Sequence, residues 1–453
     1  MSVSPARAAA FDILLRVERE SSYASDLLHS TAHERLSTPD HALATELVMG
    51  VLRWRSRLDD DIATASSQPL HKLDLEILIA LRLALYQFQW LDRVPPRAAL
   101  HESVELVKRA RKRSAAPFVN AVLRKLSVAP RSSKTVGDVP SSSDALARVL
   151  AHPQWLVERW TLEYGLSVAH QICQHNQAVP TTAIRLRTAT AEEQLNQQGI
   201  ALVPGRLLAF ARRVEAEDIT NTKAFRNGEA AIQDEASQLV AALVGHALPG
   251  ERSQILDCCA APGGKTLAIA DNNPMAAITA VELHPHRGRL LQKRLHAHPS
   301  ESARIRIVTA DAQHLPVSQQ FDRVLADVPC SGTGTLARNP EIKWRLTLDD
   351  LTELAQRQLA ILRSALAQVA PGGRLIYSTC SLEKEENERV VEQALSESKS
   401  YRVLDCRMAL DRMKSAGELS WPDPASLTRG PYLRTIPGVH PCDGFFAAIV
   451  ARV

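Results

Sequence analysis

Two cysteines, Cys330 and Cys380, each follow a stretch that is predicted to be a β-strand, at 323–326 and at 374–378. A cysteine thiolate is a nucleophile that can form a covalent intermediate with a substrate. A lone cysteine in an intracellular protein is usually an inert apolar side chain. These two, however, lie in polar, turn-forming sequence after strands that are expected to be neighbours in one sheet. We therefore expect both thiols at a site of chemistry, although their spacing alone does not separate their roles.

A second candidate feature is the turn Cys259–Thr266, which follows the predicted strand 254–258 and contains Gly263 and Gly264. Small residues and glycines let the backbone approach a ligand closely where a helix begins. The turn does not match the phosphate-binding loop, because Ala260 stands where that loop requires glycine. The turn therefore predicts a ligand site of another kind.

Three carboxylates stand at the ends of the next predicted strands: Glu282, Asp311 and Asp327. In a doubly wound nucleotide site, an acid at the end of the second strand binds ribose hydroxyls. One such acid would usually be a solvated loop residue. Three of them, on the same edge as a glycine-rich turn, predict a nucleotide-like cofactor.

Several of these segments resemble the motifs of a known family. The runs Cys259–Thr266, Asp327–Gly334 and Tyr377–Ser381 resemble signature motifs of the RNA cytosine-5 methyltransferases of the RsmB (Sun/Fmu) family. The N-terminal part, with Phe118–Arg124, is similar to the antitermination factor NusB, an RNA-binding fold that these enzymes carry as an extension. The resemblance covers nearly the whole chain, and it favours RNA of the small ribosomal subunit (16S) as the substrate.

The resemblance implies S-adenosyl-L-methionine as the cofactor. The contacts that it implies are Cys259, Ala260, Ala261, Pro262, Gly263, Gly264, Lys265, Glu282, Asp311 and Asp327. The family commonly has Asp at the ribose-facing position, where this chain has Glu282. The longer side chain can make the same hydrogen bonds, so we expect the same function.

The resemblance also implies catalytic roles. Carbon 5 of cytosine is a poor nucleophile, and addition of a thiolate at carbon 6 makes it reactive. Cys380 is implied as that nucleophile, and Cys330 is implied in the loss of the carbon 5 proton and the release of the product. Asp327 would neutralise charge at the N3 and amino edge of the base, and Lys265 would help to hold that arrangement.

The elements that must position these residues alternate between strand and helix from about residue 253. This alternation predicts an α/β fold with a doubly wound, mostly parallel sheet, the Rossmann-like domain of class I methyltransferases. The predicted strands are 254–258, 278–283, 305–310, 323–326, 374–378, 401–404 and 445–453. We expect this catalytic domain to span 251–453.

Three regions are expected before the catalytic domain. Helical periodicity predicts an all-α, NusB-like domain at 1–127, and a Ser- and Pro-rich stretch predicts a linker at 128–149. A small α/β module is expected at 150–250. It opens with a helix and continues with a strand at 182–186, a helix at 191–198, strands near Leu207 and Ala230, and a helix at 236–244.

Two groups of cations are candidate RNA contacts. The first is a run without acidic residues that contains Lys108, Arg109, Arg111, Lys112 and Arg113 and extends through Arg124 and Lys125 to Arg131 and Lys134. The second is Arg338 and Lys343, beside Trp344, in the stretch that follows Cys330. Such cations would bind phosphates, and an aromatic ring would stack on a splayed base. The structural alternatives are a solvated helix face for the first group and a helix cap packed by Trp344 for the second.

The overall composition allows more than one domain. The chain has 453 residues, a formal net charge of +4 and seven cysteines, an odd number without zinc-type spacing. The mild positive charge suits a polyanionic partner. We expect reduced thiols, no metal, no membrane-spanning segment, a cytoplasmic location and a monomer.

Other functions remain open at this point. An amino-directed base methyltransferase would need a second proline and an aromatic residue after Asp327, and Val328-Pro329-Cys330 provides neither. An RNA-binding assembly factor without activity would not need both cysteines, and transfer RNA is an alternative substrate. The acids Glu383, Glu385, Glu386 and Glu388 are interpreted as favourable charges at a helix N-terminus, and Cys442 is expected to be structural.

Overall fold

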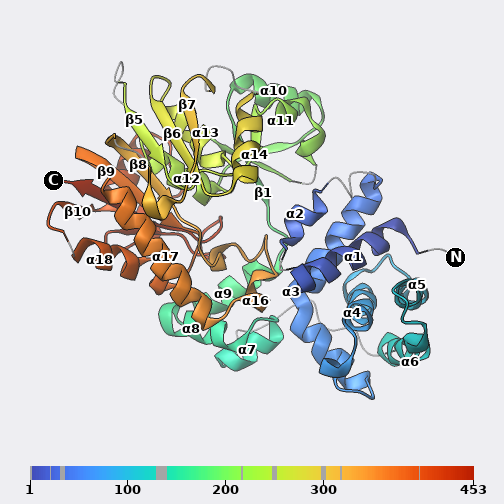
Figure 1. Cartoon of the computed structure of the whole chain (residues 1–453). Helices are drawn as coiled ribbons and strands as arrows, with labels where there is room; N and C mark the ends of the chain where they lie inside the picture. Colours follow the sequence, from blue (N-terminus) through green and yellow to red (C-terminus); the bar gives the residue numbers. More distant parts are fainter. Residues whose placement is uncertain are drawn as a thin grey trace. The chain divides into compact units, whose positions relative to one another are not determined.

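The computed structural model describes residues 3–20, 22–30, 36–128, 140–215, 218–246, 252–296, 302–316, 319–396 and 398–453. The chain divides into two units, which Figure 1 shows coloured along the sequence. Unit 1 consists of Met1–Val179 and Leu336–Arg345, and unit 2 consists of Pro180–Thr335 and Leu346–Val453. Unit 1 is therefore built from two separate stretches of the chain.

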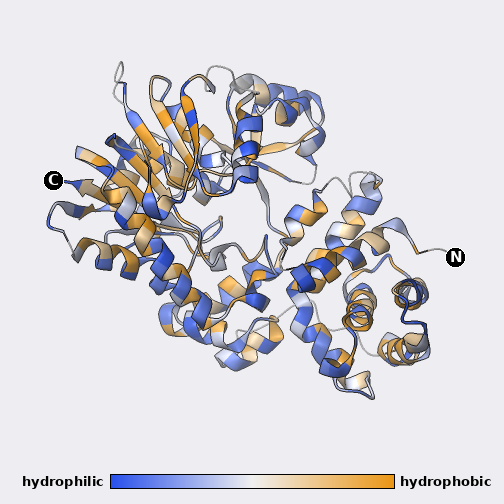
Figure 2. Ribbon diagram, viewed as in Figure 1, coloured by the Kyte–Doolittle hydropathy of each residue, from blue (hydrophilic) through white to orange (hydrophobic). Residues whose placement is uncertain are grey.

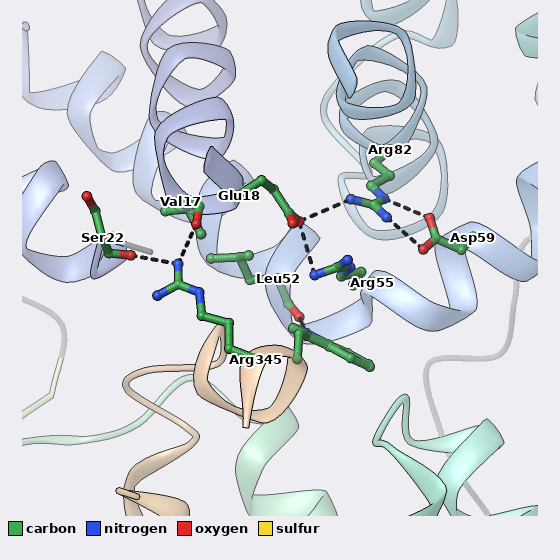
Figure 3. A network of polar contacts seen from close by, with 9 residues as sticks. Val17, Glu18, Ser22, Leu52, Arg55, Asp59, Arg82 and Arg345 are labelled. Carbon is green, nitrogen blue, oxygen red and sulfur yellow. Dashed lines mark hydrogen bonds and ion pairs between the residues drawn. The ribbon is translucent and has the colours of Figure 1, made fainter. Parts of the chain in front are cut away.

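Unit 1 is helical, and α4 (Leu75–Trp90) is its central helix. Every residue from Ile79 to Gln89 is buried, because four other helices pack around α4. Arg82 is one of these buried residues, and its guanidinium is neutralised by Asp59 at 2.7 Å and by Glu18 at 3.3 Å (Figure 3). The surrounding helices are α1 (Pro5–Glu20), α3 (Thr38–Ala65), α5 (Pro96–Arg109) and α6 (Ala116–Ser127).

The remaining helices of unit 1 are α2 (Ala24–Leu28), α7 (Ser143–Val149), α8 (Gln154–Tyr164), α9 (Leu166–Gln177) and α16 (Ile342–Arg345). Helix α7 occupies the end of the predicted linker, and 129–139 of that linker lie outside the described residues. The boundary predicted near residue 150 falls inside unit 1, which continues to Val179. The helices that were expected to open the α/β module thus belong to the helical unit.

Unit 2 contains a small antiparallel sheet with the strand order β2-β3-β1-β4. Its strands are β1 (Thr182–Leu186), β2 (Leu202–Pro204), β3 (Ala211–Val214) and β4 (Ala230–Ile232). Helices α10 (Ala189–Gln197), α11 (Lys223–Arg226) and α12 (Glu235–Leu243) accompany it. The strand expected near Leu207 is wrong, because Leu207 lies between β2 and β3 and donates its backbone N–H to Glu235 at 2.7 Å.

The large sheet of unit 2 has the order β11-β12-β13-β9-β8-β5-β6-β7, and β10 pairs with β13. Strands β7, β6, β5, β8 and β9 are parallel neighbours, and β13 joins β9 in the antiparallel direction. The carboxyl ends of the parallel strands therefore meet at one edge, where ligands of such sheets bind. The bounds are β5 (Gln254–Asp257), β6 (Ala277–Glu282), β7 (Ile305–Thr309), β8 (Phe321–Asp327), β9 (Val369–Thr379), β10 (Tyr401–Leu404), β11 (Thr428–Arg429), β12 (Tyr432–Arg434) and β13 (Phe446–Arg452).

Helices cover both faces of the large sheet, because successive side chains of a strand point to opposite faces. Ile255 and Leu325 join one core with α12, α13, α14 and α19, whereas Leu256 and Val324 join another with α17 and α18. The strands are correspondingly hydrophobic in Figure 2. These helices are α13 (Gly264–Asn272), α14 (Pro285–His296), α17 (Leu348–Leu366), α18 (Glu388–Ser396) and α19 (Cys406–Ser415).

The predicted fold class is confirmed: a doubly wound α/β domain, a small α/β part and a helical N-terminal part are all present. Within the described residues, no helix combines the length and the apolar character needed to cross a membrane.

Candidate active site

The turn between β5 and α13 depends on glycine. Gly263 has a φ of +103°, a left-handed conformation that favours glycine, and α13 begins at the next residue. A Cβ at position 263 would lie 2.4 Å from Cδ1 of Leu291, a residue of α14. The backbone N–H of Ala260 donates to the carbonyl of Val281 at 2.9 Å and ties the turn to β6. The turn thus presents backbone rather than side chains at the carboxyl edge of the sheet.

Three acids flank this turn on neighbouring strands, as predicted. Glu282 ends β6, Asp327 ends β8, and Asp311 follows β7. Glu282 is buried and accepts a hydrogen bond from the N–H of His284 at 2.9 Å, while Asp311 accepts one from the N–H of Gln313 at 2.9 Å. Because β7, β6, β5 and β8 are parallel neighbours, all three carboxylates lie at the same edge.

Asp327 is held by a cation and a hydroxyl. Its Oδ2 lies 2.8 Å from Nζ of Lys265, and its Oδ1 accepts from Oγ of Ser378 at 2.7 Å, because the strand register places Asp327 opposite Ser378. Burial alone lowers the pKa of Lys265, but the charge and the hydrogen bond of Asp327, with help from Cys380 and Asp257, raise it above its usual value. Lys265 therefore stays a cation at the edge of the sheet.

Asp257 is a site residue that sequence reasoning missed. It ends β5, is 1% exposed, and accepts from Oγ1 of Thr266 at 2.7 Å. Its other oxygen, Oδ1, has no hydrogen-bond partner among the described residues. Burial, with a smaller contribution from Asp327, raises the pKa of Asp257 to about 6. Its place directly before the glycine-rich turn was the signal that could have revealed it.

The two predicted cysteines lie together. The Sγ atoms of Cys330 and Cys380 are 3.1 Å apart, and the backbone N–H of Cys380 points to Sγ of Cys330 at 3.2 Å. Both thiols are free and partly exposed. The contact with Cys380, followed by burial and by the charge of Glu386, raises the pKa of Cys330 well above its usual value. Cys330 therefore keeps its proton while Cys380 lies beside it.

Glu386 links the loops that carry the two cysteines. It is fully buried and accepts from the N–H of Ser331 at 2.8 Å, from Nε2 of Gln358 at 2.8 Å, and from the hydroxyls of Ser331 and Ser381. The sequence interpretation of Glu386 as a favourable charge at a helix N-terminus missed this set of buried hydrogen bonds. Residues 331 and 381 directly follow the two cysteines, so one carboxylate connects both loops.

The loop after Cys330 is also packed against the motif at 440–446, which leads into β13. The N–H of Gly334 donates to the carbonyl of Cys380 at 2.9 Å, and the N–H of Gly444 donates to the carbonyl of Gly334 at 2.8 Å. A Cβ on Gly334 would lie 2.1 Å from the Gly444 carbonyl oxygen, so only glycine fits. Cys442 is buried in this motif, in agreement with the structural role expected for it.

The known proteins that this chain resembles agree with the chemistry that the site suggests. Residues 246–451 match the family described as 16S rRNA methyltransferase RsmB/F, and residues 4–127 match the NusB family. A Bacillus subtilis protein named "Probable ribosomal RNA small subunit methyltransferase B" is 34% identical over 411 residues, which cover 88% of this chain and 90% of that protein. The chain belongs to the RsmB/F family. The resemblance that the motifs indicated is thereby confirmed, and the protein is a methyltransferase.

Other relatives of this RsmB/F family member agree. Ribosomal RNA small subunit methyltransferase B of Vibrio cholerae is 29% identical over 455 residues, which cover 98% of this chain and 97% of that protein. Among solved structures, PH0851 has a TM-score of 0.78 at 22% identity and covers 99% of both chains. A methyltransferase homolog from Pyrococcus horikoshii has a TM-score of 0.56 at 24% identity, over 69% of this chain and 100% of that one. The two structures support the fold.

The prediction that Lys343 contacts RNA is wrong. Lys343 is 1% exposed, and its ammonium donates to the carbonyls of Arg53 at 3.0 Å and Ala151 at 2.6 Å. Burial lowers the pKa of Lys343 well below its usual value. The ammonium also lies 4.8 Å from the ring of Trp344, so the packed alternative holds. Arg338, nearby, is partly buried and has interactions of its own.

The first basic group is partly neutralised by acids from elsewhere in unit 1. Lys108 pairs with Glu105 at 2.7 Å, Arg109 with Asp12 at 2.7 Å, and Lys112 with Asp74 at 2.8 Å. Asp12 and Asp74 are distant in sequence, so inspection of the run alone could not reveal them. Arg111, Arg113, Arg124 and Lys125 are exposed, and Arg131 and Lys134 lie outside the described residues. Contact of this group with RNA stays a prediction.

Proposed function

We propose that this RsmB/F family member methylates carbon 5 of a cytosine in 16S ribosomal RNA, with S-adenosyl-L-methionine as methyl donor and with Cys380 bonded transiently to carbon 6. The observation that carries the proposal is the 3.1 Å contact between the Cys330 and Cys380 thiols at the carboxyl edge of the sheet. The names of the relatives support the RNA, and the NusB match supports RNA binding by the helical part.

The residues at the edge fit the cofactor. Gly263 and Gly264 leave two adjacent positions of the turn without a side chain, and Oδ1 of buried Asp257 lacks a hydrogen-bond partner among the described residues. Ribose hydroxyls are donors that suit carboxylates such as Glu282 at the end of β6. The residues proposed to hold the cofactor are those of the turn from Cys259 to Lys265, with Glu282, Asp311 and Asp327. When bound, S-adenosyl-L-methionine supplies an electrophilic methyl group.

The covalent step proposed for Cys380 makes carbon 5 reactive. A bond forms between the sulfur and carbon 6, and the electron pair of the C5–C6 double bond becomes available at carbon 5. The ring gains negative charge, which the Asp327–Lys265 pair is proposed to counter at the N3 and amino edge. The electron pair at carbon 5 then bonds to the methyl group, whose bond to the donor's sulfonium sulfur would break and leave its electron pair on that sulfur.

Completion of the reaction needs a base for the carbon 5 proton, and we assign that role to Cys330. The contact with Cys380 is the largest cause of the raised pKa of Cys330. Once the Cys380 sulfur is bonded to carbon 6, the hydrogen bond that raises the pKa of Cys330 is weakened, and Cys330 releases its proton to solvent. Cys330 then takes the proton from carbon 5, the bond between sulfur and carbon 6 breaks, and its electron pair returns to Cys380.

The experiment is transfer of labelled methyl from S-adenosyl-L-methionine to 16S RNA, with transfer RNA as a second substrate. We expect Cys380→Ala to abolish transfer and Cys330→Ala to accumulate a protein–RNA adduct that survives denaturation. Cys406→Ala is the control, since that thiol is buried at the start of α19 and donates a hydrogen bond to the Ala447 carbonyl at 3.6 Å. Undiminished transfer by Cys380→Ala refutes the nucleophile, and normal turnover without adduct removes Cys330 from the mechanism. Mapping 5-methylcytosine in the product identifies the base.

The proposal extends to the setting of the enzyme: a cytoplasmic monomer that acts on RNA and needs no metal. Sedimentation of the purified protein with and without RNA measures its oligomeric state. Activity after treatment with a chelator measures the need for a metal.

A further inference from the structure

Helix α14 concentrates positive charge. It contains four Arg and Lys residues and no Asp or Glu: Arg287, Arg289, Lys293 and Arg294. The formal net charge of the whole chain is +4, so this one helix carries as much net positive charge as the entire protein. Much of α14 is correspondingly hydrophilic in Figure 2.

The apolar face of α14 is already occupied. Gly288, Leu291 and Leu295 are buried, at the helical spacing that places them on one face. This face packs on the large sheet, where a Cβ on Gly288 would lie 3.8 Å from Cγ2 of Ile307. The four cations lie on the remaining surface and are exposed. Arg287 and Arg294 are seven residues apart, so they lie on one side of the helix about 10 Å from each other.

These cations have no acidic partner within the part of the chain that the structure describes. The only polar contact of their side chains there is local, from Nε of Arg289 to the carbonyl of Pro285 at 3.4 Å. The basic group of unit 1 differs, because Lys108, Arg109 and Lys112 are each paired with a carboxylate. Cations without a carboxylate partner can neutralise phosphates and so release the counterions condensed on a nucleic acid. Helix α14 is therefore the stronger candidate for a polyanion.

The position of α14 connects this surface to the active-site edge. The helix begins three residues after Glu282, at the carboxyl end of β6. Its buried residue Leu291 is the side chain against which the Gly263 turn packs. One end of a polyanion bound along α14 would therefore lie at the edge of the sheet where the two thiols are.

We propose that the exposed face of α14, formed by Arg287, Arg289, Lys293 and Arg294, binds the phosphate backbone of the RNA whose cytosine enters the active site. The proposal rests on the function proposed above, and it assigns to that function an RNA-docking surface in unit 2.

RNA is favoured over an anionic membrane by the apolar residues of α14. A helix that inserts into lipid presents a whole apolar face beside its cations. Leu291 and Leu295 are instead buried against the sheet, and Leu290 is the one leucine of the helix that is exposed. A single exposed leucine does not form such a face, so the charge of the helix suits a polyanion in solution.

The test compares two variants of the full chain that lose the same charge. The α14 variant carries R287Q, R289Q, K293Q and R294Q, since glutamine keeps helix propensity. The control variant carries R402Q, R407Q, R412Q and K414Q on β10 and α19 of the same unit. The measurements are the Kd for a fragment of 16S RNA as a function of salt, the Kd for S-adenosyl-L-methionine, and binding to vesicles that contain anionic phospholipid.

For the α14 variant we expect RNA binding at least tenfold weaker and a slope of log Kd against log salt reduced by about 3, since each phosphate that is no longer neutralised lowers the slope by roughly 0.7. Binding of S-adenosyl-L-methionine should change less than twofold. The pairs R287Q/R294Q and R289Q/K293Q should each give about half of the reduction in slope, which provides a test if the fourfold variant is unstable.

RNA binding by the α14 variant equal to that of the control variant overturns the proposal. Loss of vesicle binding with normal RNA binding overturns it too, in favour of a lipid surface. The proposed function can fail separately: if the wild-type chain forms no 5-methylcytosine but the α14 variant still loses RNA affinity, the surface stands and the chemistry does not. If the wild type methylates cytosine and both variants bind alike, only the surface fails.

Discussion

Glu386 and Asp257 are both buried carboxylates near the carboxyl edge of the large sheet, and they differ in the donors that face them. Glu386 receives hydrogen bonds from Ser331, Ser381 and Gln358, whereas Asp257 receives a side-chain hydrogen bond from Thr266 at one oxygen only. A buried carboxylate with few donors is poorly stabilised as an anion, which is the case of Asp257. Glu386 is expected to matter through the loops that it connects, and Asp257 through its pKa.

We predict that Glu386→Gln lowers the rate of methyl transfer at saturating substrates by about 10- to 100-fold, the equivalent of roughly 1.4 to 2.7 kcal/mol. The amide has one acceptor oxygen instead of two, so the hydrogen bonds to the Ser331 and Ser381 loops cannot all form. The Kd of S-adenosyl-L-methionine should be unchanged, because Glu386 does not belong to the glycine-rich turn. Glu385→Gln is the control, since that residue pairs with the largely exposed Arg389. Equal rates for the two variants would show that Glu386 does not position the thiols.

The pH dependence of stability is predicted from Asp257. Its pKa is raised to about 6 in the folded protein, from a usual value near 3.8, so between these values the folded state binds more protons than the unfolded one. Stability from this group is therefore present below pH 3.8 and is lost as the pH rises through about 6. Relative to Asp257→Asn, the wild type should gain about 1 kcal/mol on going from pH 7 to pH 5, measured by urea unfolding. Parallel pH curves for the two proteins would contradict this assignment.

The candidate site residues that the sequence predicted are those that belong to motifs of adjacent residues. Cys330, Cys380, Asp327 and Lys265 lie within recognisable motifs, and the structure brings them to one edge. The role of Glu386 depends on hydrogen bonds to residues 331 and 358, which are far from it in sequence. The predicted RNA contact of Lys343 failed for the opposite reason. Its motif is basic and aromatic, but tertiary packing buries the side chain.

At the scale of elements, two helices and one turn form a close junction. Gly263 is the residue before α13, and its missing Cβ leaves room for Leu291 of α14. The glycine-rich turn, the helix that follows it and the basic helix α14 therefore depend on each other in packing. A change at residue 263 must move at least one of them.

We predict that Gly263→Ala weakens binding of S-adenosyl-L-methionine at least tenfold, measured by calorimetry. The new Cβ meets Leu291 at 2.4 Å, and residue 263 has a φ of +103°. Gly372→Ala is the matched control: its φ is +74°, but nothing lies within 4 Å of its Cβ. The control should lose about 1 kcal/mol of stability through backbone strain and keep its cofactor affinity. Equal loss of affinity in both variants would show that packing against Leu291 is unimportant.

The sequence also predicted most elements of the large sheet. Short β-rich runs that alternate with helices identified β5 to β10 and β13. The central strands of this sheet are apolar because helices cover both of its faces. The small sheet was harder, since β2 and β3 are short and only partly buried. Leu207, although fully buried, lies in the turn between them, so hydrophobicity alone gave a strand in the wrong place.

At the scale of the whole molecule, unit 1 includes the distant segment Leu336–Arg345. Arg345 donates to the carbonyls of Val17 at 2.6 Å and Ser22 at 2.7 Å (Figure 3), and Trp344 donates to that of Leu52 at 2.6 Å. Glu341 accepts from the N–H of Ala24 at 2.8 Å. The segment thus supplies hydrogen-bond partners to backbone groups at the end of α1 and the start of α2.

We predict that Arg345→Ala speeds amide hydrogen exchange in α1 and α2, more than 300 residues away in sequence. Two carbonyls lose a charged donor, which costs about 1.5 to 3 kcal/mol for each hydrogen bond of this type. Exchange followed by mass spectrometry measures the effect. Arg16→Ala is the control, because its pair with Glu20 is exposed and is worth little. Unchanged exchange in α1 and α2 would mean that the segment does not stabilise them.

The two-part construction of unit 1 has a consequence for biosynthesis. Domains generally fold as they leave the ribosome, starting from the N-terminus. Here the helices up to Val179 emerge well before Leu336–Arg345 does. Until then the carbonyls of Val17, Ser22 and Leu52 lack the donors that this segment supplies. We therefore expect the helical unit to reach its final stability only after translation has passed Cys330, the first of the two cysteines at the carboxyl edge of the sheet.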